Sequence, residues 1–292
     1  MTAAARPAAR PTVLLATFQL APAGETGGER LVAALDARGV DARWAVWDDP
    51  AVDWAGADLV AVRATWDYHR RLPAFLEWAR RTEAATRLLN GAATFAWNAD
   101  KTYLVGLAES VPTVPTRAVD DATLRPVLAA ATADWGTVVV KPATGAGGVG
   151  VVVVDSVEDP RLEGLTAGPW VVQPLVASVR TTGETSVFVL DGRPVLQVDK
   201  RPAGGEVRVH EQYGGSSRAV PLVDEIAVVA RRAVEAAQEL RSTTLDYARV
   251  DLLHHDGAWA VSELELIEPG LYLDVAPEMA EHVAELVVRR LG

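Results

Sequence analysis

Two neighbouring apolar runs near the C-terminal end of the chain carry three acidic side chains. Residues 249–265 read RVDLLHHDGAWAVSELE, with Asp251 in the first run and Glu263 and Glu265 in the second. Side chains two residues apart in a strand point to the same face, so Glu263 and Glu265 lie together. A turn through residues 255–257 would bring Asp251 beside them. The spacing therefore predicts a β-hairpin with three carboxylates converging on one face.

Carboxylates that converge repel one another unless a cation lies between them. Ligands that are all oxygen suit Mg²⁺ better than zinc, and Mn²⁺ accepts the same ligands. We therefore expect Asp251, Glu263 and Glu265 to hold Mg²⁺, and we expect removal of one carboxylate to relieve repulsion in the metal-free protein. Arg249 lies on the same strand face as Asp251. It could form a structural salt bridge with one of the carboxylates, take part in catalysis, or do both.

A glycine-rich segment precedes this hairpin in the sequence. Residues 138–155 read VVVKPATGAGGVGVVVVD. The glycines at 145–150 match the G-x-G-x-x-G pattern of dinucleotide-binding folds, but that pattern requires a following helix, whereas a run of valines follows here. We predict two strands joined by a turn whose N–H groups cover phosphates; an ordinary mobile hairpin is the alternative. Lys141 ends the first strand, where its ammonium can reach a phosphate.

The composition argues against several classes of function. The formal net charge of −11 disfavours nucleic acids and anionic membranes as partners. The lack of cysteine excludes disulfides, thiolate nucleophiles, Cys-ligated zinc and iron–sulfur clusters. Residues 1–11 lack the apolar core of a signal peptide, and no apolar run approaches the length of a membrane span. We expect a soluble cytoplasmic protein, either a monomer or a homodimer.

The order of apolar patterns predicts three lobes. In residues 1–95, short β-rich runs alternate with helical patterns, which indicates an open α/β lobe with a parallel sheet. Residues 96–178 and 179–292 combine strand pairs with fewer helices, which indicates two α+β lobes. The last lobe contains a hairpin turning at Asp191 and Gly192, a long helix and the acidic hairpin.

The ordered set of motifs resembles the ATP-grasp superfamily, in the layout of bacterial glutathione synthetase and D-alanine–D-alanine ligase. The motifs are, in sequence order, Lys101, Lys141-Pro with the glycine-rich turn, VVQPLV at 171–176, Glu184, Arg249-Val-Asp251 and Glu263-Leu-Glu265. The resemblance covers residues 95–292, and the lobe before them matches the family's N-terminal domain in type. It implies an ATP-grasp fold in which ATP lies between the two α+β lobes.

The resemblance also implies roles for individual residues. ATP would contact Lys101, Lys141, Gly145, Gly147, Gly148, Gln173, Val176 and Glu184. Asp251, Glu263 and Glu265 would hold two Mg²⁺ ions. The catalytic groups would be Lys141, Arg208 and Arg249, with Arg249 stabilising the transferred phosphoryl group. The chain departs from the common pattern at Pro174, where many members have an acidic residue, and at Glu265, where they often have asparagine.

Two segments are candidates for substrate contacts. Residues 63–68 follow an apolar strand, at the end where open α/β sheets bind ligands, and their arginine, aspartate and aromatics suit a zwitterionic amino acid. Packing of the aromatics against the next lobe is an equal alternative. Residues 200–216 offer arginines for a carboxylate. The candidate substrate residues are Arg63, Trp66, Asp67, Tyr68, Arg201, Arg208, Glu268 and Tyr272.

The segments RATWDYH and ELELIEPGLYL further resemble a subgroup of ATP-grasp ligases of secondary metabolism that includes the O-ureidoserine cyclo-ligase of cycloserine formation. The resemblance implies carboxylate–amine ligation through an acyl phosphate, with ADP and phosphate as products. A dipeptide or glutathione-like ligase and a non-catalytic nucleotide-binding protein are the alternatives. The strand after the glycines disfavours a nicotinamide dehydrogenase.

Overall fold

The first sheet forms the α/β lobe expected at the start of the chain. In the computed structural model, which describes residues 9–165 and 168–292, its strands are all parallel and lie in the order β2-β1-β3-β4. The elements of this lobe are β1 (Thr12–Thr17), α1 (Gly28–Asp36), β2 (Asp41–Val46), β3 (Leu59–Ala64), η1 (Tyr68–Arg71), α2 (Leu72–Ala85), β4 (Arg87–Leu88) and α3 (Gly91–Asn98). Alternation along β1 explains the layers: Val13 and Leu15 pack towards α1, and Leu14 and Ala16 towards α2 and α3. The predicted open α/β lobe is confirmed.

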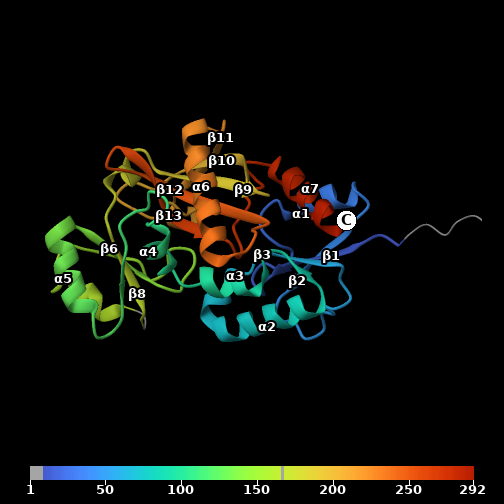
Figure 1. Cartoon of the computed structure of the whole chain (residues 1–292), viewed down its shortest axis with the longest axis horizontal. Coiled ribbons are helices and arrows are strands. Elements are labelled where there is room, and N and C mark those ends of the chain that lie inside the picture. Colours follow the sequence, from blue (N-terminus) through green and yellow to red (C-terminus); the bar gives the residue numbers. More distant parts are fainter. Residues whose placement is uncertain (1–8, 166–167) are drawn as a thin grey trace, which may run out of the picture.

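The second sheet lies at the opposite end of the molecule (Figure 1). Its antiparallel strands lie in the order β5-β8-β6-β7, with α5 packed on them. The elements are α4 (Tyr103–Leu107), β5 (Arg117–Val119), α5 (Leu124–Trp135), β6 (Val138–Pro142), β7 (Val152–Val154), η2 (Pro160–Gly164), β8 (Trp170–Pro174) and η3 (Ala177–Arg180). Val138 pairs with Val154, so a strand does follow the glycine-rich turn. A dinucleotide-binding fold requires a helix at this position, and here a strand occupies it.

The third sheet lies between the other two (Figure 1). Its antiparallel strands lie in the order β11-β10-β9-β12-β13, and α4 and α6 cover one face. The elements are β9 (Glu184–Leu190), β10 (Arg193–Arg201), η4 (Glu211–Tyr213), β11 (Ser216–Val220), α6 (Asp224–Arg241), β12 (Tyr247–His255), β13 (Ala258–Glu265) and α7 (Met279–Leu291). Asp191 and Gly192 form the expected β9–β10 turn with φ of 50° and 71°.

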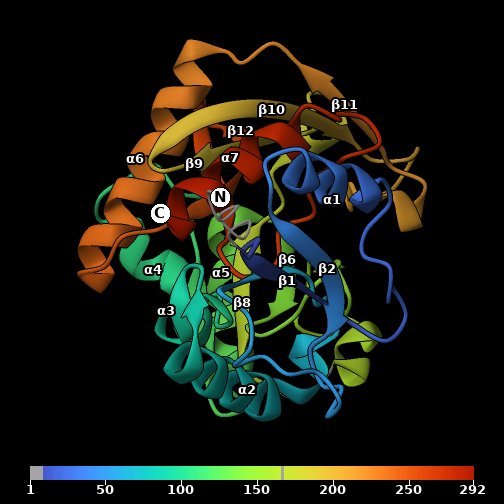
Figure 2. The same cartoon turned by 90° about the vertical axis from the view of Figure 1, so that its right-hand side faces the viewer.

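The C-terminal helix returns to the first lobe. Figure 2 shows α7 beside α1, where Arg38 and Glu281 form an ion pair of 2.7 Å. Val283 and Val287 of α7 share a core with β1 and with Phe188 of β9. The first and third sheets are therefore joined by a continuous apolar core. Within the described ranges, no helix combines the length and the apolar character needed to cross a membrane.

Candidate active site

The acidic hairpin forms as the spacing predicts, with its turn at Asp256 and Gly257. Arg249 lies opposite Glu265, and Asp251 lies opposite Glu263. The alternate residues Val250, Leu252 and Leu264 belong to the apolar core under α6. Because one set must face this core, the charged set faces the open side of the sheet.

The neighbouring strands extend this charged face with a lysine that the sequence analysis missed. Ser186 of β9 lies opposite Asp251, and Lys200 of β10 lies opposite Glu184. Lys200 is only 2% exposed, forms an ion pair with Glu184, and has its Nζ 3.4 Å from Asp251 Oδ2. Counting outward from the Asp191-Gly192 turn would place Asp199 opposite Glu184, but a register shift between Pro194 and Leu196 brings Lys200 there instead, so the sequence pattern did not indicate it.

The carboxylates do not form the converging cluster that the sequence predicted. The Arg249 guanidinium donates to both oxygens of Asp251, at 2.9 Å each, and also contacts Glu265. Among the described residues, no group of three or more acidic or histidine side chains is close enough together to hold a metal ion. The correction has a simple cause: Arg249 shares their strand face and occupies the oxygens that would otherwise meet.

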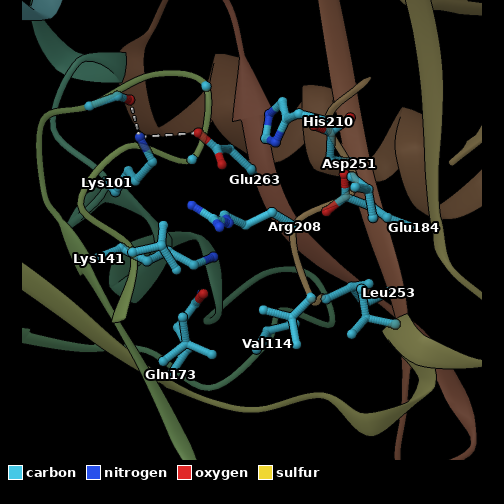
Figure 3. A pocket seen from close by; sticks show the side chains of 18 of the residues that line it. Lys101, Val114, Lys141, Gln173, Glu184, Arg208, His210, Asp251, Leu253 and Glu263 are labelled. Atoms are coloured by element: carbon cyan, nitrogen blue, oxygen red, sulfur yellow. Dashed lines mark hydrogen bonds and ion pairs between the residues drawn. The ribbon is translucent and has the colours of Figure 1, made fainter. Parts of the chain in front are cut away.

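Lysines pair with this acidic set from both sides. Lys101 Nζ lies 3.2 Å from Glu263 Oε1 and donates to Gly145 O at 2.6 Å, as Figure 3 shows. Burial opposes ionisation of Glu263, but Lys101 and Lys141 outweigh it and lower its pKa. Burial likewise opposes ionisation of Asp251, and Arg249 and Lys200 hold its pKa well below the usual range. Both groups are therefore ionised at neutral pH.

This donor set fits Mg²⁺ by its chemistry. Asp251, Glu263 and Glu265 offer only oxygen atoms, two of the three are held ionised by nearby cations, and all border the same cavity. Burial raises the pKa of Glu265. A divalent cation would supply the positive charge that Arg249, Lys200 and Lys101 now supply to these oxygens.

A cleft of about 150 Å³ separates the second sheet from the charged face (Figure 3). The predicted ATP-contacting residues all line it, namely Lys101, Lys141, Gly145, Gly147, Gly148, Gln173, Val176 and Glu184. Burial lowers the pKa of Lys141, which is the last residue but one of β6. Gln173 Nε2 donates to Thr116 Oγ1 at 2.9 Å. The geometry thus brings the predicted phosphate-binding and adenine-binding residues to one cleft, while their roles stay predictions.

The glycine-rich turn packs against residues 206–213 of the third lobe. Gln212 Nε2 donates to Gly147 O at 2.7 Å. Gly148 has φ of 69°, and a Cβ there would lie 3.2 Å from Arg208 Cδ. The positive φ and this close approach explain why glycine occupies the position. Arg208 lines the cleft, stacks on Tyr213 and pairs with Glu206 at 2.6 Å.

A second cavity of about 420 Å³ adjoins the cleft. The two share residues of the glycine-rich turn together with His210, Glu265 and Glu268. The first lobe contributes Phe18, Glu25, Trp66, His69 and Arg70 to its wall. The third lobe contributes Arg249, Tyr272 and Asp274. The cavity therefore lies between the first and third lobes, with Arg249 on its inner side.

Four of the predicted substrate residues lie outside this cavity and the cleft. Arg63 is buried, donates from Nη2 to Pro269 O at 3.3 Å and stacks over the Tyr247 ring. Asp67 accepts from Trp47 Nε1 at 2.9 Å.

Tyr68 is also buried, with its ring packed on Phe75. Arg201 is exposed and donates to Thr181 O. The expectation for the 63–68 segment fails because residues 268–271 cover the end of β3 and the following segment, which leaves only Trp66 facing the cavity. Trp66, Arg208, Glu268 and Tyr272 do line the cavity or the cleft, as predicted.

Two family descriptions match the chain. Residues 13–90 match the N-terminal domain of D-cycloserine synthetase DcsG. Residues 113–270, more than half of the chain, match the ATP-grasp domain of prokaryotic glutathione synthetase. The chain belongs to the ATP-grasp family. The predicted resemblance and the ATP-grasp fold are confirmed.

Individual relatives cover most of this ATP-grasp chain. The cycloserine biosynthesis protein DcsG of Streptomyces lavendulae is 31% identical over 271 residues, 87% of this chain and 90% of the relative. The crystal structure of D-cycloserine synthetase DcsG matches with a TM-score of 0.84 and 28% identity, covering 96% of this chain and 100% of that one. The D-alanine–D-alanine ligase of Bacillus anthracis, 15% identical with a TM-score of 0.65 over 97% of each chain, shares the fold.

This protein is therefore an ATP-grasp ligase, homologous to DcsG, and catalyses ATP-dependent ligation of a carboxylate to an amine. ATP-grasp ligases generally use ATP together with Mg²⁺, and related ligases act on small amino-acid or peptide substrates. The cleft lined by the predicted ATP-contacting residues lies between the second and third sheets.

Proposed function

We propose that this ATP-grasp ligase phosphorylates the carboxylate of a small amino-acid derivative and then closes it onto a side-chain nitrogen of the same molecule, as in cycloserine formation, where this nitrogen belongs to the ureido group. The observation that carries the proposal is the cavity of about 420 Å³ that opens onto the nucleotide cleft at Glu265 and Glu268. It is walled by the lobe that matches the DcsG N-terminal domain. A site of this volume suits one small molecule.

The chain's own groups account for the first half of the reaction. Lys101 and Lys141 lie on the same side of the cleft, opposite Asp251 and Glu184, where they can neutralise ATP phosphates. Asp251, Glu263 and Glu265 would hold Mg²⁺, which supplies further neutralisation of the phosphate charge when it is bound. A substrate carboxylate oxygen can then attack the γ-phosphorus, which breaks the bond to ADP and leaves an acyl phosphate.

Arg249 could assist the second half of the reaction, in which a nitrogen attacks the acyl phosphate. Its side chain reaches from the metal-ligand face to the wall of the substrate cavity. There it can stabilise the negative charge that develops on the acyl oxygen when the amine nitrogen attacks the acyl carbon. The new C–N bond forms, the C–O bond to phosphate breaks, and the amine proton is lost to solvent.

The test supplies ATP and Mg²⁺ with O-ureidoserine of either hand, with D-alanine, or with γ-glutamylcysteine and glycine. We expect ADP and phosphate release with O-ureidoserine alone, and a cyclic product by mass spectrometry. ADP release that requires two separate substrates would favour a dipeptide or glutathione-like ligase instead. AMP and pyrophosphate as products would contradict the acyl-phosphate route.

A further inference from the structure

Three side chains of the first lobe hold one short segment of the third lobe. Trp66 Nε1 donates to the first carbonyl of residues 268–271 at 3.3 Å, and Arg63 Nη2 donates to the second at 3.3 Å. Glu25 Oε2 accepts from the N–H of the fourth residue at 2.6 Å. This segment follows β13 and leads into Tyr272, so the first lobe positions part of the cavity wall.

Glu25 has a second oxygen that this clamp does not use. The side chain is 8% exposed and lines the substrate cavity. Its Oε1 is buried and has no hydrogen-bond partner within residues 9–165 and 168–292. A buried carboxyl oxygen without a partner costs free energy, and such a cost is retained where a ligand supplies the missing donor.

The electrical surroundings favour a donor that carries positive charge. Burial raises the pKa of Glu25 to about 7, with Arg63 the strongest opposing influence. Glu265, on the same cavity, is already paired with Arg249. A ligand ammonium beside Glu25 would favour the ionised carboxylate and form a charge-assisted hydrogen bond.

We propose that Glu25 is a specificity-determining residue that accepts a hydrogen bond from the amino group of the substrate. This inference rests on the proposed function, because it needs a substrate built on an amino acid. The recognition works chiefly by exclusion: an acid that fills the cavity without an amino group leaves Oε1 buried and unpaired. The other oxygen of Glu25 accepts a hydrogen bond from residue 271. Binding of the amino group to Glu25 is therefore coupled to the positions of the neighbouring cavity residues Glu268 and Tyr272.

The experiment compares O-ureidoserine with its deaminated analogue, 3-(ureidooxy)propanoate. For the wild type and Glu25→Gln, kcat and KM are measured by ADP release. Equilibrium binding of each probe is measured by calorimetry with Mg²⁺ and a non-hydrolysable ATP analogue. Glutamine keeps an oxygen for the N–H of residue 271 but removes the carboxylate. We expect binding of O-ureidoserine to weaken by roughly 10- to 100-fold, with the analogue changed less than about threefold.

Glu29→Gln is the matched control, because Glu29 is exposed at the start of α1, and it should leave both probes unchanged. Thermal unfolding verifies that each variant is folded. Unchanged discrimination in Glu25→Gln would overturn the inference. If the wild type binds O-ureidoserine more tightly than its deaminated analogue but releases no ADP, the proposed function is contradicted. The role of Glu25 in recognising the amino group is still supported. Failure of the wild type to bind O-ureidoserine would overturn both.

Discussion

The nucleotide cleft and the substrate cavity share several wall residues but satisfy their polar groups in opposite ways. In the cleft, Lys101 pairs with Glu263, Lys200 pairs with Glu184, and Arg249 bridges Asp251 and Glu265. In the cavity, Glu25 Oε1, His69 Nδ1 and His210 Nδ1 are buried with no hydrogen-bond partner in the described part of the chain. Most charged side chains of the cleft are therefore paired, with Lys141 an exception among the described residues, whereas the cavity contains buried groups whose hydrogen bonds a ligand could complete.

This difference separates two ways of keeping polar groups in a protein interior. Paired charges stabilise the face that carries Asp251, Glu263 and Glu265, and a metal ion that bound there would have to displace existing ion pairs. Unpaired groups offer an unmet hydrogen bond to a ligand, which makes them sensitive to its chemistry. We therefore expect substitutions in the cleft to change stability and turnover together, and substitutions in the cavity to change specificity and pH dependence.

The largest effect is expected for Asp251→Asn. Its carboxylate accepts from Arg249 and Ser186 and lies beside Lys200, so asparagine leaves two buried cations underpaired. The free energy of unfolding should fall by about 3–5 kcal/mol, and ADP release should fall by at least about a thousandfold. Denaturant unfolding and an ADP assay measure the two. Unchanged stability would restore the expectation from sequence, in which losing a carboxylate relieves repulsion.

Lys141→Met should separate stability from nucleotide binding. Lys141 is partly buried and has no ion-pair partner among the described residues, so methionine should leave the free energy of unfolding unchanged or higher. The affinity for ATP should fall by roughly 10- to 100-fold, measured by calorimetry. Lys101→Met is the matched comparison, since Glu263 then loses its nearest cation and stability should fall. Equal loss of stability in both variants would contradict the contrast.

The pH dependence of stability should distinguish Glu25 from the paired carboxylates. Its folded pKa of about 7 lies above the ordinary 4.5, so the folded state holds a proton that the unfolded state releases between these values. The wild type should therefore lose about 3 kcal/mol relative to Glu25→Gln as pH rises from 4.5 to 7. Denaturant unfolding at several pH values measures the difference. Parallel profiles would show that Glu25 is ionised in the folded protein.

The smallest effect is expected for Arg201→Ala, compared with Arg208→Ala on the same segment. The Arg201 side chain is exposed and, among the described residues, forms a hydrogen bond only with the Thr181 carbonyl, whereas Arg208 lines the cleft beside Gly148. Arg201→Ala should leave the substrate KM within about twofold of the wild type. Arg208→Ala should lower kcat/KM by an amount equivalent to about 2–4 kcal/mol. A larger effect for Arg201 would place a substrate contact outside both spaces.

Much of the cleft could be predicted because it depends on strand alternation. The period of two places Arg249, Asp251, Glu263 and Glu265 on one face, and the valines after the glycine-rich turn indicate a hairpin. The same rule does not predict the position of Lys200, because a register shift between Pro194 and Leu196 changes which residue of β10 lies opposite Glu184. Alternation could not show that Arg249 would lie between the carboxylates, because that depends on the side-chain conformation and on the pairing of charges.

By itself, the sequence determined which residues of the acidic hairpin share a strand face, where the hairpins turn, and the resemblance to a ligase family; the metal-binding role of the carboxylates stays a prediction. Only the tertiary structure decided which faces are covered. Arg63 lies near the end of β3, the apolar strand that suggested a ligand site, yet the segment 268–271 covers it. Glu25 carries no local motif, yet it lines the cavity. Local periodicity orients a side chain within its element, but burial depends on which distant segment packs against that element.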